Sequence, residues 1–168
     1  MPSRKKVVEF NTNDFVVYPT HGVGRILGIE QQDFSGTTID VVVIRFEQDR
    51  MTLRVPLEKA RGLGLRTLSS KKQMEDAIST LQGKARTRRD MWAKRAKVYD
   101  EKIRSGDPVS IAEVVRDLHR KENKAEQSYS ERQMYQAALD RLAREFAAIE
   151  QIPQSAAADK LENLMNVA

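Results

Sequence analysis

The sequence predicts an α+β fold, with a small β-barrel at the N-terminus and a compact all-helical domain of about five helices after it. Residues 14–57 carry strand-like segments separated by turns, with a side-chain period of two. From Ser69 onward the apolar period changes to about 3.6, and glycine and proline become boundary marks of helices. We therefore expect two domains, over residues 9–66 and 69–168, which suits a chain of 168 residues.

The N-terminal half contains four or five short segments rich in β-branched and aromatic residues. The first covers residues 15–18, and the strongest covers residues 38–46 after a hairpin signal at Ser35-Gly36. Pro56 should end the last of the longer strands, because proline lacks a backbone N–H. Strands of this kind within roughly 50 residues bury their apolar face by curling into a small SH3-like or Tudor-like barrel. Residues 58–70 are then a short packed connector.

Five amphipathic stripes follow the connector, and each has a start signal. The predicted signals are, in order, Ser69 or Ser70, Thr87 with Asp90, Asp107 with Pro108, Ser130 with Gln133, and Ser155. The stripes comprise Met74, Ala77, Ile78 and Leu81; Trp92, Ala96, Tyr99 and Ile103; Ile111, Val114, Val115 and Leu118; Met134, Ala138, Leu142, Phe146 and Ile149; and Leu161, Leu164, Met165 and Ala168.

The available residue types leave little material for catalysis. The chain has no cysteine, which excludes disulfides, a thiol nucleophile and cysteine-ligated zinc, and its two histidines are too few for a histidine metal site. Neither His21 nor His119 has a serine or cysteine motif near it, so we interpret both as solvated or half-packed side chains. Acidic residues such as Glu145 and Asp117 fit helix-surface charges. We predict no catalytic residue, no metal and no cofactor.

The hydropathy of the chain and the charge at its N-terminus bear on the location of the protein in the cell. No apolar run approaches the roughly 20 residues of a membrane helix, and the basic start of the chain is not followed by the hydrophobic stretch of a signal peptide. We expect a cytoplasmic protein that makes no membrane contact. No long apolar stripe is left beyond the helix cores, so a monomer is expected.

All of the net positive charge lies in one stretch. The chain has 29 Lys+Arg and 24 Asp+Glu, a net charge of +5, whereas residues 84–97 hold seven basic residues and one acidic residue, a net charge of +6. A local basic cluster suits a polyanion, because cations that contact phosphates release condensed counterions from nucleic acid. A solvated helix face gives the same pattern. The run alone leaves both interpretations open.

Trp92, the only tryptophan, lies inside this basic cluster. Its spacing with Tyr99 and Ile103 favours a core residue that packs between helices. Its place at a helix start among arginines and lysines also fits a ring that lies partly outside the core. Such a ring can act as a minor-groove wedge, which inserts at a base step and costs a few kcal/mol of unstacking. Composition does not decide between the two.

Three stretches of the sequence together are more specific. Residues 14–25 contain a Tyr-Pro-x-His-Gly turn, residues 53–60 contain an Arg-Val-Pro strand, and residues 92–118 contain a Trp-Ala-Lys-Arg start and a Ser-Gly-Asp helix junction. In this order they resemble the CarD/CdnL-type bacterial transcription regulators, whose N-terminal module is shared with transcription-repair coupling factors. The resemblance covers residues 9–150.

The resemblance implies a nucleoid-associated transcription regulator that catalyses no reaction. Its helical domain would contact promoter DNA at the upstream edge of the bubble, largely independently of sequence, and stabilise the open complex. Trp92 matches the residue that wedges into the minor groove in this family. The matching basic residues are Lys94, Arg95, Lys97 and Arg132, and the neighbouring Arg88 and Arg89 of the cluster complete the expected DNA-binding set.

The resemblance also implies that the Tudor-like domain binds the lobe of the RNA polymerase β subunit. Arg54 matches the arginine associated with this docking, and Met51, Leu53 and Gln32 complete the expected polymerase-binding set. Gln32 stands where the family has a second arginine, so this contact is weakened or replaced.

Two other interpretations fit the same residues. In one, the chain is a general interaction module, whose Tudor-like barrel binds another protein and whose basic helix contacts RNA. In the other, Trp92 is a core residue and the basic cluster only keeps the surface soluble. The basic arm of Arg4, Lys5 and Lys6 is interpreted as a disordered tail.

Overall fold

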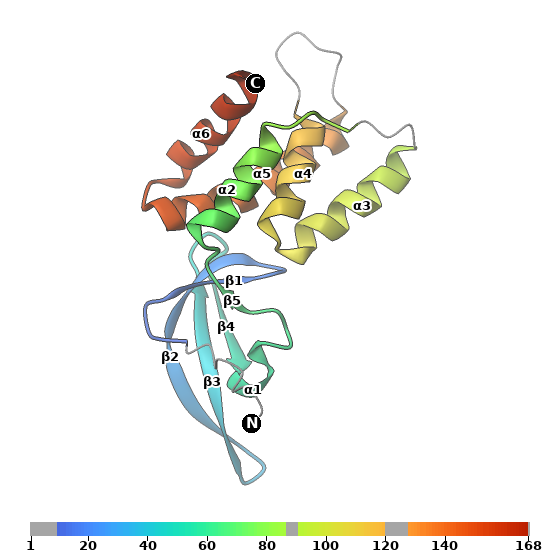
Figure 1. The fold of residues 1–168 in the computed structure, drawn as a ribbon. Coiled ribbons are helices and arrows are strands. Elements are labelled where there is room, and N and C mark those ends of the chain that lie inside the picture. The colour runs from blue at the N-terminus through green and yellow to red at the C-terminus, as the bar shows by residue number, and fades with distance from the viewer. Residues whose placement is uncertain (1–9, 87–90, 120–127, 168) are drawn as a thin grey trace, which may run out of the picture.

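The computed structural model of the chain describes residues 10–86, 91–119 and 128–167. It confirms the α+β class, because an antiparallel five-stranded sheet is followed by helices. We call residues 10–67 the β module and residues 71–167 the helical module. Figure 1 shows the helical module at one end of the sheet, while the turn between β2 and β3 lies at the opposite end. The helical module, which contains Trp92, therefore lies away from the turn between β2 and β3.

The sheet has the strand order β4-β3-β2-β1-β5, and every pair in it is antiparallel. Its strands are β1 (Phe15–Tyr18), β2 (Gly22–Phe34), β3 (Thr37–Phe46), β4 (Met51–Pro56) and β5 (Arg66–Thr67). Ser35 and Gly36 both adopt positive φ, as the predicted hairpin turn requires. Pro56 is the last residue of β4, also as predicted. A four-residue helix, α1 (Leu57–Ala60), follows within the expected connector.

The β module has its own apolar core on one face of the sheet. Val42, Ile44 and Phe46 alternate along β3 and place their side chains on this face, where β4 contributes Val55. The buried members of this core are Phe10, Val16, Ile26, Val42, Ile44, Phe46, Val55, Ala60 and Leu65.

Five helices make up the helical module in its described parts, as predicted. They are α2 (Lys71–Leu81), α3 (Trp92–Ser105), α4 (Pro108–Leu118), α5 (Tyr129–Glu150) and α6 (Gln154–Val167). The 22-residue α5 is about 33 Å long and contacts α4, α6, α3 and β2. It therefore connects the far end of the helical module with the sheet.

Several predicted helix boundaries are confirmed. The Ser70 hydroxyl accepts a hydrogen bond from the backbone N–H of Gln73. The side-chain oxygen of Gln73 in turn accepts one from the backbone N–H of Ser70, so α2 begins with a full capping box. Asp107 caps α4 by accepting from the amide of Ser110, with Pro108 in the first position. Gly106 ends α3 in the left-handed conformation with φ 72°.

Other predicted helix starts are wrong by a few residues. Ser128, not Ser130, caps α5, because its hydroxyl accepts from the backbone amide of Glu131 in the first turn of the helix. Gln154 is the first residue of α6, which places Ser155 inside the helix. Met91 is the N-cap of α3 and makes no side-chain cap. The predicted capping box of Thr87 and Asp90 lies outside the described residues.

The core of the helical module is built from all five helices around α5. Its fully buried side chains include Leu118 on α4, Leu142 on α5 and Leu161 on α6. Trp92 belongs to the partly buried residues that pack against this core rather than to the core itself. Among the described residues, no helix combines the length and apolar character needed to cross a membrane.

Candidate nucleic-acid interface and its connection to the sheet

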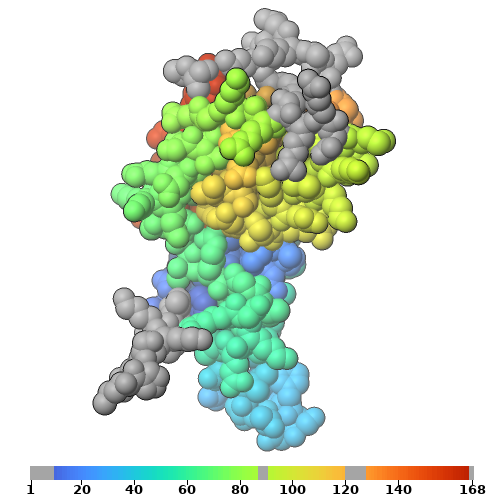
Figure 2. Space-filling model, turned by 45° about the vertical axis from the view of Figure 1, so that its right-hand side comes forward, coloured from blue at the N-terminus to red at the C-terminus, as the bar shows by residue number. Residues whose placement is uncertain are grey.

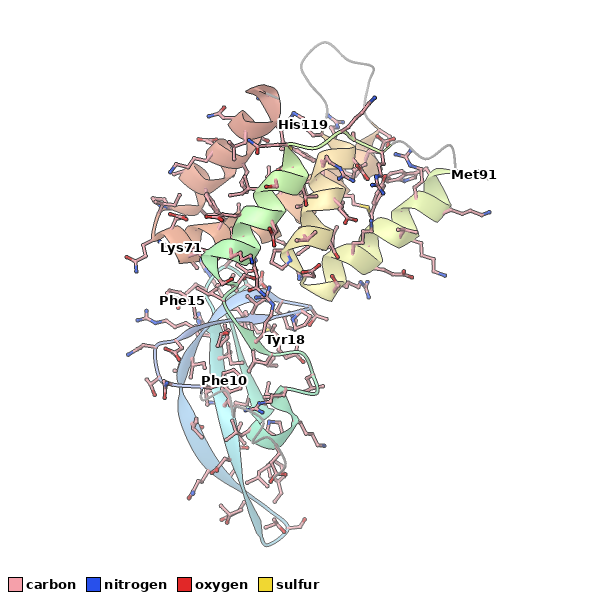
Figure 3. The ribbon with its side chains drawn as sticks, viewed as in Figure 1. Phe10, Phe15, Tyr18, Lys71, Met91 and His119 are labelled. Atoms are coloured by element: carbon pink, nitrogen blue, oxygen red, sulfur yellow. The ribbon has the colours of Figure 1, made fainter. Side chains whose placement is uncertain are left out.

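Trp92 is the first residue of α3 and is half-buried. Met91, its neighbour, is 76% exposed, and Figure 3 shows Met91 at the end of α3 that lies away from the sheet. One side of the indole packs on the helical core, with its centroid 6.2 Å from the Tyr99 ring. The two sequence interpretations of Trp92 each describe part of the result: its ring contacts the core, but it is not enclosed by it.

Arg95 lies against the same aromatic pair. Its guanidinium carbon is 5.6 Å from the centroid of Trp92 and 5.8 Å from that of Tyr99, within the range of cation–π contacts. Its Nε atom is buried and has no hydrogen-bond partner among the described residues. Arg95 thus places a positive charge beside a half-buried indole, which suits an anionic partner such as a phosphate group.

The remaining expected DNA-binding cations are exposed where the structure describes them. Lys94 and Lys97 lie on α3 within two turns of Trp92, and Arg132 lies in the first turn of α5. In Figure 2, α3 forms part of the surface of the helical module, above the blue and teal β module. Arg88 and Arg89 lie outside the described residues. Lys94 and Lys97 thus lie on the same helix as Trp92 and Tyr99.

A small basic cavity adjoins Arg95. It has a volume of about 210 Å³, and Arg86, Lys94, Arg95 and Lys102 line it opposite one carboxylate, Asp117. Asp117 accepts from the backbone amide of Arg86 at 3.0 Å and from Nε of Arg116 at 2.9 Å. The local excess of positive charge suits an anionic group on a partner.

The sequence-based assignment of Asp117 and Glu145 to helix surfaces is wrong. Both carboxylates are buried, at 8% and 4% exposure. Helical spacing alone misled the prediction, because each residue has a partner far away along the chain, which periodicity does not report. Asp117 binds the backbone of residue 86, and Glu145 binds the connector described below.

On the β module, Arg54 lies on the sheet face opposite the apolar core. Its cross-strand partner is Val43, and its Nε is 3.6 Å from a carboxylate oxygen of Glu30, with about half of each side chain exposed. Gln32 lies on the same face, because its partner Ile39 is four residues from Val43 on β3. The structure thus brings Arg54 and Gln32 to one face, with Glu30 beside them.

Met51 and Leu53 are placed differently. Both alternate with Arg54 along β4, so their side chains turn to the other face of the sheet, where they pack against the apolar core. They are half-buried rather than enclosed. The four expected polymerase-binding residues therefore do not form one patch: two lie on each face of the sheet.

A partly buried ion pair joins the modules. The Arg66 guanidinium donates to both carboxylate oxygens of Glu145, at 2.7 and 2.8 Å, and to the carbonyl of Gly106 at 2.7 Å. The Glu145 carboxylate also accepts from the backbone amide of Ser69 at 2.8 Å. One side chain of β5 is thereby fixed to α5 and to the turn between α3 and α4.

A second contact joins α5 to the turn between β1 and β2. Arg141 donates to the carbonyls of Pro19 and Thr20, each at 2.5 Å. Burial, and then the nearby Arg144, lower the pKa of the Arg141 guanidinium, while Asp49 partly opposes this shift. Together with the ion pair of Arg66, this contact fixes the orientation of the modules at two points.

The histidines are half-packed, in line with the prediction. His21 stacks on Tyr18 at 5.4 Å. His119 lies 3.2 Å from the Tyr135 hydroxyl, which donates to Glu162, and burial followed by the charge of Glu162 raises the pKa of Tyr135. No group of three or more potential metal ligands occurs among the residues that the structure describes.

Sequence reasoning missed the residues of the joint, Arg66, Arg141 and Glu145. Arg66 and Glu145 are 79 positions apart, and no local pattern relates them. The one signal in the sequence is the charged residue Arg66 within the predicted connector. This signal is weak, because most charged residues in connectors are solvated.

Comparison with known proteins gives consistent matches over both modules. The family model for the CarD C-terminal domain matches residues 76–162, and the CarD-like/TRCF RID domain model matches residues 10–69. YdeB of Bacillus subtilis, described as a transcription factor, is 30% identical over 145 residues, which cover 86% of this chain and 95% of that protein. The solution structure of the 72-residue N-terminal domain of Myxococcus xanthus CarD is 31% identical in sequence, with a TM-score of 0.32. The match covers 42% of this chain and 93% of the CarD domain.

Proposed function

This chain belongs to the CarD-like family of transcription regulators, and we propose that it holds RNA polymerase with its β module while its helical module contacts promoter DNA at the upstream edge of the bubble. The observation that carries the proposal is the half-buried ring of Trp92 at the exposed start of α3, beside the Arg95 guanidinium. A ring that packs on the core and is not fully buried suits insertion at a base step.

The wedge acts through differential affinity for the open state. Insertion costs a few kcal/mol of unstacking in intact duplex, and this cost is smallest where the strands already part. A ligand that binds the open complex about 1–3 kcal/mol more tightly than the closed one shifts that equilibrium by roughly 5- to 150-fold. Lys94, Lys97 and Arg132 contribute phosphate contacts, which hold the backbone without reading sequence.

The β module docks on the β-subunit lobe through the sheet face that carries Arg54 and Gln32. Arg54 is half-exposed and paired only with the half-exposed Glu30 at 3.6 Å among the described residues, a geometry that contributes little to stability. Its guanidinium is therefore free to exchange this partner for a carboxylate of the polymerase. Met51 and Leu53, on the other face, support this edge of the sheet from the core side.

The joint between the modules gives the two contacts a fixed geometry. Arg66, Glu145 and Arg141 hold α5 against the sheet, and α5 reaches to the end of the helical module where Arg132 lies. Docking of the sheet on polymerase then positions Trp92 at one place on the DNA, and the DNA contact becomes an intramolecular one with a high effective concentration.

The experiment measures the lifetime of open complexes after a competitor is added, together with recovery of polymerase on the tagged protein. Trp92→Ala should retain polymerase but lose the lifetime increase, whereas Trp92→Phe should keep part of it. Arg54→Glu should lose polymerase, and Arg104→Glu, an exposed arginine on α3 outside both sites, serves as the charge-reversal control. Unchanged lifetimes with Trp92→Ala would refute the wedge, and recovery of ribosomal proteins in place of polymerase would favour an RNA-associated module.

A further inference from the structure

A cleft between the two modules has no role in the function proposed above. It has a volume of about 560 Å³, which lies in the usual range for small-molecule sites. Phe15, Val23, Arg25 and Arg45 of the sheet form one wall, and Arg144, Ala147, Ala148 and Ile152 form the other. Figure 3 shows Phe15 at the boundary between sheet and helices. The cleft therefore lies beside the joint and includes residues of both modules.

The charges in this cleft are unbalanced. Arg25 and Arg45 are direct cross-strand partners, so their like charges are held opposite one another on the same face, an arrangement that destabilises a sheet. Arg144 adds a third guanidinium from α5, and its Nε atom is buried without a hydrogen-bond partner among the described residues. Glu47 is the single acidic residue in the described lining, and its side chain is 80% exposed.

The cations have few internal partners. Arg45 lies 3.7 Å from Glu47 and donates to the Thr52 hydroxyl at 3.2 Å. Arg25 contacts the ring of Phe15 at 5.9 Å, and no ion pair involves Arg25 or Arg144 within the described ranges of the chain. An anion among the three guanidiniums would offset the repulsion between their like charges.

The walls between the arginines are apolar. Phe15 is a large aromatic residue that remains 45% exposed, and Val23, Ala147, Ala148 and Ile152 extend the same surface. Glutamines lie at the rim, including Gln154, the first residue of α6, where the helix dipole is positive. A duplex is too wide for such a concave site, whereas a small molecule with one acidic group and an apolar body fits its chemistry.

We propose that this cleft binds an amphipathic monoanion, namely a carboxylate with an aliphatic or aromatic body. The carboxylate lies among Arg25, Arg45 and Arg144, and the body lies on Phe15 and the apolar wall of α5. Because the ligand contacts both modules, it stabilises their packing against each other. The inference is independent of the DNA and polymerase contacts, since binding is measured on the free protein.

Octanoate is the probe, titrated into the full chain by calorimetry and by amide chemical-shift mapping. The expected Kd is about 1 mM or tighter for a ligand of this size, and each methylene added from butanoate to octanoate should tighten it about fourfold. Octanol and octyltrimethylammonium are the neutral and cationic controls and should bind at least about tenfold more weakly. The Tm should rise with octanoate concentration.

Two variants locate the site. Arg144→Met should weaken octanoate binding at least about tenfold, because it removes one cation and keeps a side chain of similar length. Arg104→Met, which changes an exposed arginine on α3 away from the cleft, should leave the Kd unchanged. Ala148→Trp should block the cleft by volume. The proposal is overturned if the unaltered protein shows no saturable binding, if octanol binds as well as octanoate, or if the shifted amides lie away from the cleft.

Discussion

Replacing Glu145 with glutamine is expected to destabilise the protein by about 2–3 kcal/mol. The carboxylate accepts from Arg66 at 2.7 and 2.8 Å and from the Ser69 backbone amide at 2.8 Å, and the side chain of Glu145 is 6% exposed. Glutamine keeps the side-chain volume, but it removes the charge and turns its NH2 group toward the Arg66 guanidinium or the Ser69 N–H, both of which are donors. Each hydrogen bond to a charged group contributes about 1.5–3 kcal/mol, and the 31% exposure of Arg66 lets water replace part of the loss.

Urea unfolding followed by far-UV circular dichroism measures this effect, and the corresponding fall in Tm is about 4–12 °C for a chain of this length. Arg66→Met should cost a similar amount. The double variant Arg66→Met/Glu145→Leu should be less destabilised than the sum of the Arg66→Met and Glu145→Leu single variants, with a coupling of about 2 kcal/mol, since an apolar pair avoids an unpaired buried charge. Asp100→Asn, in an exposed i,i+4 pair, should cost under about 0.5 kcal/mol. Additive single effects would refute the role of this pair as a joint.

Three further predictions concern the fold and its pH dependence. Arg141→Met should increase relative motion of the modules, seen as separate rotational correlation times in NMR relaxation, and a single unchanged value would contradict this. Gly106→Ala should lower the free energy of unfolding by about 1–2 kcal/mol, because residue 106 has φ 72° and the added Cβ would lie 3.1 Å from Pro19; equal urea midpoints would contradict it. The raised pKa of Tyr135 means that the folded chain holds this proton more tightly, so stability is full below about pH 10 and falls as pH rises further. Tyr135→Phe should reduce that alkaline loss, and identical pH profiles would contradict the assignment.

Local patterns in the sequence were enough to predict most of the elements. The hairpin at Ser35-Gly36 and the caps at Ser70 and Asp107 depend on residues within three positions of one another, and the structure confirms them. The spacing of Ser130 and Gln133 predicts the start of α5 at Ser130, whereas the hydroxyl that caps this helix in the structure is that of Ser128.

The candidate site was predictable in composition but not in arrangement. Trp92 and its basic neighbours follow from the sequence, whereas the contact of Arg95 with two rings, and the half-burial of the indole, depend on how α3 packs. Leu53 and Arg54 are expected in one binding set, but the period of two along β4 places their side chains on opposite faces of the sheet. Glu145 was misassigned because its partner lies in the other module.

The most direct test of the central claim is base unstacking at the upstream edge of the bubble. 2-Aminopurine placed at that base step reports unstacking as increased fluorescence in a polymerase–promoter complex. The unaltered protein should raise this emission, and Trp92→Ala, added at a concentration that gives equal polymerase occupancy, should not. Equal emission from the two proteins would show that the indole does not enter the DNA, and would contradict the proposed mechanism.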